Sequence, residues 1–356
     1  MYELNDKIRD LKPYDPISGD YKIRLDANES FLSVPQEIRK EIAAKIVDAA
    51  WNRYPDPTAS GVCRAFGNYY GVPEEYITAG NGSDELISVI LSAFLQRGEK
   101  ALTISPDFSM YRFYASIAEA ENINLAKPDT LKTDPDEVIR TIREKGARLV
   151  IFSNPCNPTG QGLNREEVRH IVSSVDALVV LDEAYMDFWD ESFLSEAWKY
   201  ENLIVLRTCS KAFGMAAIRL GFAIACRKIT DAIRAVKSPY NINTFTQIAG
   251  KAVLSQKELL RSGTEQIRAS AASLSREMEK ISQEFPGKWE LFPTCTNFVF
   301  LRSAQAENVF RRLLDAGIAV RFFRFAQLGD FLRITAGSPE ENEVLCRTLR
   351  EILREV

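Results

Sequence analysis

The sequence predicts an α/β protein in which a mostly parallel sheet is flanked by helices, joined to a second, smaller α+β unit. The first observation is that short runs of aliphatic and β-branched residues alternate with segments whose apolar residues recur every three or four positions. This is the pattern of strands alternating with amphipathic helices. The second is that three of the β runs are almost wholly apolar, as expected of strands covered by helices on both faces.

The elements of the large unit are expected in the following order. An N-terminal arm without clear periodicity precedes helices over Gln36–Ala50 and Ser83–Gln96, where apolar residues recur at helical spacing. Strands follow at five β-rich runs: Lys100–Ile104, Leu149–Ser153, Ala177–Leu181, Leu203–Arg207 and Leu220–Ala225. The turn-poor stretch Asn243–Phe285 is helical in pattern and long enough to bridge two domains.

The rest of the chain predicts the smaller α+β unit. Its strands are expected over Asn297–Leu301, Ala319–Phe322 and Phe331–Thr335, and its helices over Ala304–Ala316 and Glu340–Glu355. A chain of 356 residues has room for about two domains. We therefore expect residues 1–35 to form an arm and part of the small domain, 36–242 the large domain, 243–285 bridging helices, and 286–356 the small C-terminal domain.

The charge balance argues against nucleic acid or a membrane as a partner. The chain has 45 basic and 49 acidic side chains, a net charge of −4, without a long run of like charge. No apolar run reaches the ~20 residues of a membrane helix, and the first residues lack the apolar core of a signal peptide. A small anionic substrate remains compatible with this balance, because a few arginines suffice to bind one phosphate.

The cysteine and histidine content excludes further classes of site. The six cysteines are scattered without a C-x-x-C pair, so we expect reduced thiols and a cytoplasmic protein rather than a disulfide framework or zinc ribbon. The single histidine, His170, is expected to be an exposed helix residue. One histidine is too few for a His-rich metal site and leaves most Ser-His-Asp arrangements without a candidate base, so no metal site is expected.

Chemically informative residues follow the predicted strands, where ligands bind in open α/β sheets. Asp182 and Tyr185 follow the run Ala177–Leu181. Taken alone, this pair also fits an acidic helix start followed by a packed tyrosine. Lys211 follows the run Leu203–Arg207 among small and apolar residues, where desolvation would free its amine as a nucleophile, although a lone lysine more often points into solvent.

Three further groups of residues complete the pattern. The segment Asn154–Gly160 holds two Asn-Pro steps and a Thr-Gly, which favour a rigid loop that positions the amide of Asn157. Gly80–Glu85 opens a helix whose free N–H groups suit a phosphate, although Ser and Asp at a helix start are also ordinary caps. The hydroxyls of Thr208 and Ser210 and the guanidinium of Arg219 are candidates for the same phosphate.

Together these motifs are far more specific than any one of them. Asn157, Asp182, Tyr185, Lys211 and Arg219 occur in this order, each next to the end of a predicted strand, and so resemble the site of the fold-type-I aminotransferases that use pyridoxal phosphate (PLP). Within that superfamily, five segments look like the histidinol-phosphate aminotransferase branch: Leu25–Glu29, Arg53–Asp56, Gly80–Glu85, Arg207–Gly214 and Leu332–Thr335. Cys156, Cys209 and Ala217 depart from the usual residues, but none of these changes removes a charged or hydrogen-bonding group that the chemistry needs.

The resemblance implies a role for each residue of the cofactor site. Lys211 forms the Schiff base with PLP and later moves the substrate proton, and Asp182 keeps the ring nitrogen protonated. Tyr185 and Asn157 bind the phenolic oxygen, and Phe108, which alone would be read as a core residue, stacks on the ring. The phosphate rests on Gly82, Ser83, Asp84, Thr208, Ser210 and Arg219. Tyr54 reaches this phosphate from the neighbouring subunit, which implies a homodimer.

The resemblance also implies the substrates. L-Histidinol phosphate and 2-oxoglutarate are expected to share one anionic pocket, giving imidazole acetol phosphate and L-glutamate in histidine biosynthesis. Arg333 is the expected carboxylate or phosphate ligand, with Tyr14, Asn28, Asn157 and Arg321 as further substrate contacts. Arg324 lies near Arg321 in the sequence and is an alternative to it.

Two other activities remain open at this point. An aromatic-amino-acid aminotransferase uses the same machinery, and threonine-phosphate decarboxylase, a lyase, shares the fold and the lysine. A non-catalytic PLP-fold regulator is disfavoured by the intact set of Asp182, Tyr185, Lys211 and Arg219.

Overall fold

The structure is a computed structural model that describes residues 2–9, 11, 13, 16–326 and 328–355. Its centre is a seven-stranded sheet with the strand order β2-β8-β7-β6-β5-β3-β4. The strands are β2 (Ile77–Gly80), β3 (Lys100–Ser105), β4 (Glu121–Ala126), β5 (Leu149–Ser153), β6 (Leu178–Asp182), β7 (Leu203–Thr208) and β8 (Gly221–Ala225). β7, β6, β5, β3 and β4 run parallel, whereas β8 is antiparallel to both of its neighbours. The predicted fold class, a mostly parallel sheet with a smaller unit, is confirmed.

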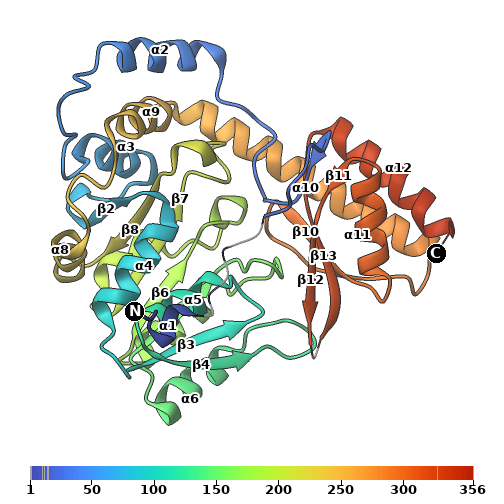
Figure 1. Cartoon of the computed structure of the whole chain (residues 1–356), viewed down its shortest axis with the longest axis horizontal. Coiled ribbons are helices and arrows are strands. Elements are labelled where there is room, and N and C mark those ends of the chain that lie inside the picture. Colours follow the sequence, from blue (N-terminus) through green and yellow to red (C-terminus); the bar gives the residue numbers. More distant parts are fainter. Residues whose placement is uncertain (1, 10, 12, 14–15, 327, 356) are drawn as a thin grey trace.

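Helices cover both faces of this sheet (Figure 1). On β5, Val150 and Phe152 pack into one apolar cluster, and Leu149 and Ile151 pack into another on the opposite face. The first cluster draws on α3 (Ser60–Tyr70), α6 (Pro135–Lys145) and α7 (Arg165–Ser174), and the second on α4 (Gly82–Phe94), α5 (Met110–Ile117) and α8 (Arg227–Val236). Because successive strand residues point to opposite faces, burial on both faces explains why these strands are apolar throughout.

A second, antiparallel sheet has the order β12-β13-β10-β9 and lies at the red and orange end of the chain (Figure 1). Its strands are β9 (Glu290–Phe292), β10 (Phe298–Arg302), β12 (Arg321–Phe325) and β13 (Gly329–Thr335). It packs with α10 (Lys257–Glu284), α11 (Ala306–Asp315) and α12 (Pro339–Glu355) around a separate apolar cluster. Near the start of the chain, β1 (Ile23–Arg24) pairs in parallel with β11 (Ile318–Ala319).

Three of the expected elements differ in the structure. The single strand expected over Ala319–Phe322 is wrong, because the chain passes from β11 to β12 at Val320 and so joins two different sheets. The expected helical stretch Asn243–Phe285 is interrupted at Ser255–Gln256, between α9 (Thr244–Leu254) and α10. The helix expected over Gln36–Ala50 ends at Val47 as α2 (Gln36–Val47), and none of its residues is fully buried.

Strands β2 and β4 were not anticipated. β2 has only four residues and is buried throughout, so it shows no alternation. β4 (Glu121–Ala126) is a sheet edge of alternating, half-exposed residues. His170 lies on α7 as predicted, with an exposed imidazole whose Nε2 is 2.8 Å from Asp136 Oδ1. Within the described part of the chain, no helix is both long and apolar enough to cross a membrane.

Candidate active site

Three neighbouring strands deliver the predicted residues to one edge of the large sheet. Asp182 is the last residue of β6, which lies between β5 and β7. Asn157 follows β5 by four residues, and Lys211 follows β7 by three. These strands are parallel, so their carboxyl ends meet at the same edge, where open α/β sheets bind ligands.

Asp182 is a buried carboxylate with a defined set of donors. Its Oδ2 accepts a hydrogen bond from the Tyr111 hydroxyl at 2.7 Å, and its Oδ1 accepts one from the Ala184 N–H at 3.0 Å. Burial raises the pKa of Asp182 to about 6, while the two hydrogen bonds act in the opposite direction. A cationic ring nitrogen bound here would be stabilised by this carboxylate, and the carboxylate would in turn be stabilised in its ionised form. Sequence reasoning missed Tyr111.

The N-terminal segment crosses the site and binds Tyr185. Asn28 is fully buried, and its Nδ2 donates to the Tyr185 hydroxyl at 2.9 Å. Its own backbone N–H donates to Thr335 Oγ1 at 3.0 Å, and that hydroxyl donates back to Asn28 Oδ1. Asn28 has a φ of +54°, a left-handed conformation that asparagine tolerates better than most residues. The segment therefore links the large sheet to β13.

Lys211 points toward the same segment. Its Nζ donates to the backbone carbonyl of Ala27 at 2.8 Å and lies 5.9 Å from the centre of the Tyr185 ring. The side chain is half-buried rather than pointing freely into solvent. The lysine amine and the tyrosine hydroxyl thus approach one site from two strands.

Arg333 reaches the site from the small unit. It is 7% exposed, and its guanidinium donates to Asn157 Oδ1 and, at 2.6 Å, to the backbone carbonyl of Asp26. Arg321 stands directly opposite Arg333 on the neighbouring strand β12, so the two side chains leave the same face of the sheet. Arg324 leaves the opposite face, where it forms ion pairs with Asp330 and Glu307 on the surface. This arrangement favours Arg321 over Arg324 as a second substrate contact.

The phosphate residues form a cradle at the start of α4. Gly82 has a φ of +83°, and a Cβ there would lie 2.8 Å from Arg219 Nη2, so the guanidinium of Arg219 sits over this glycine. Gly221 lies so close beneath the loop that a Cβ would come within 2.3 Å of the Ser83 nitrogen. Thr208 Oγ1 and Ser210 Oγ are 3.0 Å apart. Free helix N–H groups, two hydroxyls and a guanidinium are a donor set that fits a phosphate.

The remaining predicted residues are placed as follows. Phe108 is half-buried, with its ring edge-on to Tyr111 at a centroid distance of 5.4 Å. The side chain of Asp84 accepts a hydrogen bond from the Tyr114 hydroxyl at 2.9 Å, and because a carboxylate has no donor, only the backbone N–H of Asp84 could bind a phosphate. Tyr54 is 80% exposed, and its ring stacks on that of Tyr240 with the centroids 4.5 Å apart. Tyr14 lies outside the described residues.

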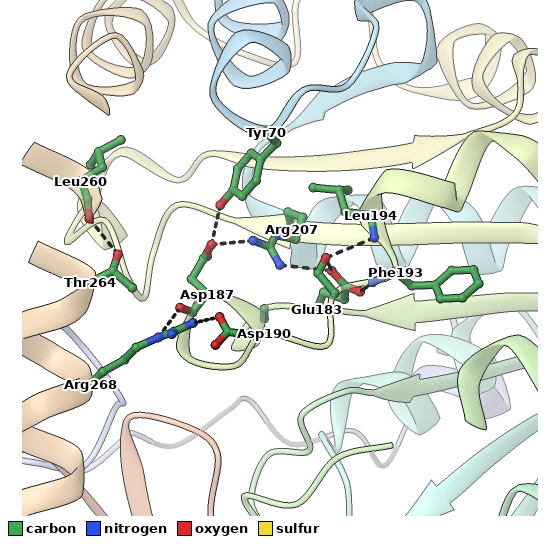
Figure 2. Close-up of polar contacts among 12 residues, drawn as sticks. Tyr70, Glu183, Asp187, Asp190, Phe193, Leu194, Arg207, Leu260, Thr264 and Arg268 are labelled. Carbon is green, nitrogen blue, oxygen red and sulfur yellow. Dashed lines mark hydrogen bonds and ion pairs between the residues drawn. The ribbon is translucent and has the colours of Figure 1, made fainter. Parts of the chain in front are cut away.

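A buried ionic cluster supports the segment between Asp182 and Tyr185 (Figure 2). Arg207, at the end of β7, donates to Glu183 at 3.1 Å and also to Asp187, so one guanidinium holds the residues two before and two after Tyr185. The Tyr70 hydroxyl donates to Asp187 at 2.6 Å, and Arg268 of α10 donates to the Asp187 carbonyl at 3.0 Å. From the sequence, Arg207 was noted only as the end of a predicted strand and the first residue of the segment Arg207–Gly214, without a role of its own.

The assembled residues fit the expected cofactor. The phosphate cradle, the carboxylate of Asp182, the hydroxyl of Tyr185 and the amine of Lys211 offer one partner each for the phosphate, the ring nitrogen, the phenolic oxygen and the aldehyde of PLP. Because position 82 is a glycine, no Cβ stands where the guanidinium of Arg219 approaches the start of α4.

Comparisons with known proteins agree with this chemistry. A family model described as aminotransferase class I and II matches residues 20–349. The chain is 41% identical over 342 residues to a histidinol-phosphate aminotransferase of Clostridium kluyveri, covering 96% of each protein. It is 39% identical to one of Clostridium novyi, covering 94% of this chain and 93% of that protein.

Among solved structures, the fold is similar to a histidinol-phosphate aminotransferase of Sinorhizobium meliloti in complex with pyridoxal-5′-phosphate. The TM-score is 0.88 at 23% identity, covering 99% of this chain and 98% of that one. At this identity the likeness concerns the fold.

Proposed function

The chain belongs to the class I and II aminotransferases, and we propose that it transfers the amino group of L-histidinol phosphate to 2-oxoglutarate with PLP as cofactor. The products are imidazole acetol phosphate and L-glutamate, in a step of histidine biosynthesis. The observation that carries this proposal is that Lys211, Asp182 and Tyr185 come from neighbouring strand ends of one sheet edge, where Arg333 binds Asn157 and the Asp26 carbonyl next to the Ala27 carbonyl bound by Lys211. The curated relatives that share 39–41% identity over nearly the whole chain are named for this reaction.

The cofactor would be held by residues of the large unit. The backbone of Gly82, Ser83 and Asp84 would bind its phosphate, together with Thr208, Ser210 and Arg219. Asp182 would pair with the ring nitrogen, and Tyr185 and Asn157 would bind the phenolic oxygen. Phe108 would pack on the ring. When bound, PLP supplies an electron sink for the pair left when the substrate Cα loses its proton.

Lys211 supplies the amine that bonds the cofactor and the base that moves the proton. In the structure its Nζ is held at the Ala27 carbonyl, beside the Tyr185 ring. With the cofactor bound, this Nζ would accept the proton that the substrate Cα loses and would return it later in the reaction. The carboxylate of Asp182 favours a proton on the ring nitrogen, which increases the electron demand of the ring.

Arg333 and Arg321 provide the anionic pocket. Both leave the same face of the small sheet, and Arg333 is already aligned by Asn157 and the Asp26 carbonyl. A planar guanidinium can bind the oxygens of a phosphate or of a carboxylate in two-pronged fashion. One pocket can therefore serve histidinol phosphate and 2-oxoglutarate in turn.

The active unit in this proposal is a cytoplasmic homodimer. Val47, Trp51 and Tyr54 are large apolar or aromatic residues that are at least 70% exposed near the end of α2. Residues of this kind are enriched in protein interfaces, and Tyr54 from a partner would complete the phosphate site. The six cysteines form no disulfide, which supports a reducing compartment.

Steady-state kinetics with purified protein test the function. Histidinol phosphate with 2-oxoglutarate should give a higher kcat/KM than phenylalanine or tyrosine with the same acceptor. A higher value for the aromatic amino acids would replace the proposal with an aromatic aminotransferase. Release of carbon dioxide from threonine phosphate without consumption of 2-oxoglutarate would replace it with a lyase.

The site assignment has its own test. Borohydride reduction of the loaded enzyme should fix the pyridoxyl group on Lys211, as peptide mapping would show. In addition, Asp182→Asn should lower the rate by roughly 10²–10³-fold while PLP is retained, because an amide cannot supply the negative charge at the ring nitrogen. A label on another lysine would overturn the assignment.

A further inference from the structure

Tyr111 lies behind the carboxylate of Asp182, on the first turn of α5. The residue is 1% exposed, and its hydroxyl is 2.7 Å from Asp182 Oδ2. The ring packs in the apolar cluster of α4 and α5, where a phenylalanine of the same shape would fill the space. The hydroxyl is therefore not needed for packing, and a buried hydroxyl that serves nothing would carry a desolvation penalty.

The charges around Asp182 oppose its ionisation. Burial raises its pKa, and so do the carboxylates of Asp107, just before α5, and of Asp84, on α4. Two groups favour the charged form: the Tyr111 hydroxyl and the Ala184 N–H. The N–H is a backbone group, so a side-chain substitution leaves its hydrogen bond to Asp182 in place. The hydrogen bond from the Tyr111 phenol is the one that a substitution can remove.

Tyr111 is also a donor at every pH of interest. Burial and the nearby carboxylates of Asp182 and Asp107 raise the pKa of this phenol well above its ordinary value. A phenol that stays protonated can donate a charge-assisted hydrogen bond to the ionised Asp182, whereas any hydrogen bond between the phenol and a neutral carboxyl group lacks that charge. Its bond is therefore strongest when Asp182 is ionised.

We propose that Tyr111 is a positioning residue that holds Asp182 in its ionised form and fixes the direction of its carboxylate toward the ring nitrogen of the cofactor. This inference rests on the proposed function, because it takes Asp182 as the partner of that nitrogen. Tyr111 contacts Phe108 as well, with ring centroids 5.4 Å apart, and so supports the predicted stacking residue from behind. The side chain of Tyr111 thus positions both Asp182 and Phe108, the two residues proposed to contact the cofactor ring.

The direct test is the titration of Asp182 in the protein without cofactor. Carboxyl ¹³C resonances of labelled aspartate are followed against pH in the wild type and in Tyr111→Phe, and Asp182→Asn identifies the signal. Loss of one charge-assisted hydrogen bond should move the Asp182 midpoint upward by about one to two pH units. The control is Tyr70→Phe, which removes a phenol that donates to a different carboxylate, Asp187, and should leave the Asp182 midpoint unchanged.

A second readout separates positioning from packing in the loaded enzyme. Tyr111→Phe should lower kcat several-fold and change its pH dependence, with little change in the KM for histidinol phosphate, because the anionic pocket is untouched. Tyr70→Phe should lower stability without a change in the pH profile. An unchanged midpoint and pH profile in Tyr111→Phe would overturn the inference.

The two proposals fail in different ways. If Tyr111→Phe has no effect but Asp182→Asn still abolishes transamination, only the role of Tyr111 is wrong. If Asp182→Asn itself transaminates normally, the proposed pairing of Asp182 with the cofactor is wrong, whatever the midpoint in Tyr111→Phe.

Discussion

Replacement of Arg207 by methionine tests how the loop that carries Tyr185 is held. Arg207 is 3% exposed and lies between the carboxylates of Glu183 and Asp187 (Figure 2). Methionine fills much of the volume without a charge, so both carboxylates lose their cationic partner. Glu183 keeps its hydrogen bonds from Ser192 and from the Phe193 N–H, and Asp187 keeps the one from Tyr70.

The expected loss in the free energy of unfolding comes from the two ion pairs that Arg207 no longer makes. Removal of one partner of a buried ion pair typically costs about 3–5 kcal/mol, because the other charge is left uncompensated. Total stability is usually about 5–15 kcal/mol, so the variant should fold with a markedly lower urea midpoint. The loop should also loosen, and PLP retention should fall with it. Arg227→Met, which breaks an exposed pair with Asp231, is the control and should change little.

The pH dependence makes this test specific. Burial already raises the pKa of Glu183, and loss of Arg207 should raise it further. A carboxyl group with a raised pKa binds its proton more tightly in the folded than in the unfolded protein, so its contribution to stability grows as the pH falls. The deficit of Arg207→Met relative to wild type should therefore shrink between about pH 8 and pH 5. Urea unfolding that shows the same deficit at both values would refute the argument.

Three further predictions concern the cofactor and substrate sites. Mixed dimers of inactive Lys211→Ala and inactive Tyr54→Ala chains should recover part of the activity, because one of their two sites carries neither change; no recovery after proven subunit exchange would argue against Tyr54 acting across an interface. Arg333→Lys should raise the KM of both substrates and leave PLP bound, because lysine cannot bind two oxygens side by side; equilibrium dialysis and kinetics check this. Gly221→Ala should weaken PLP binding at least tenfold, since its Cβ would meet the Ser83 nitrogen at 2.3 Å; unchanged affinity would mean that the phosphate loop moves freely.

Much of the fold was accessible to sequence reasoning because it depends on local pattern. The runs at β5, β6, β7 and β8 are apolar since they are buried on both faces, and their positions were predicted to within one residue. Pattern failed at the short strand β2, at the half-exposed edge strand β4 and where the chain changed sheets. The passage from β11 to β12 at Val320 carries no turn signal, because residues 318–325 contain no Gly, Pro, Asn, Asp or Ser.

Some residues of the candidate site could likewise be predicted from the sequence, whereas others depended on the tertiary structure. Asp182, Tyr185 and Lys211 could be singled out because each follows a strand, and the family resemblance supplied their proposed roles. From the sequence, Arg321 was named as a substrate contact and Arg324 was left as an alternative to it. Only the pairing of β12 with β13 separates them, since it places Arg321 opposite Arg333 and turns Arg324 toward Glu307 on the other face.

By itself, then, the sequence determined the alternation of strands and helices and the residue types at the strand ends, because periodicity and strand ends are properties of neighbouring residues. The tertiary structure alone decided which distant groups meet. Asn28 contacts Tyr185 across 157 positions, Tyr111 contacts Asp182 across 71, and Arg207 closes its pair with Glu183 across 24. Such contacts depend on how the sheet and its helices pack. The residues next to a buried hydroxyl or guanidinium in the sequence do not indicate which distant group it will contact.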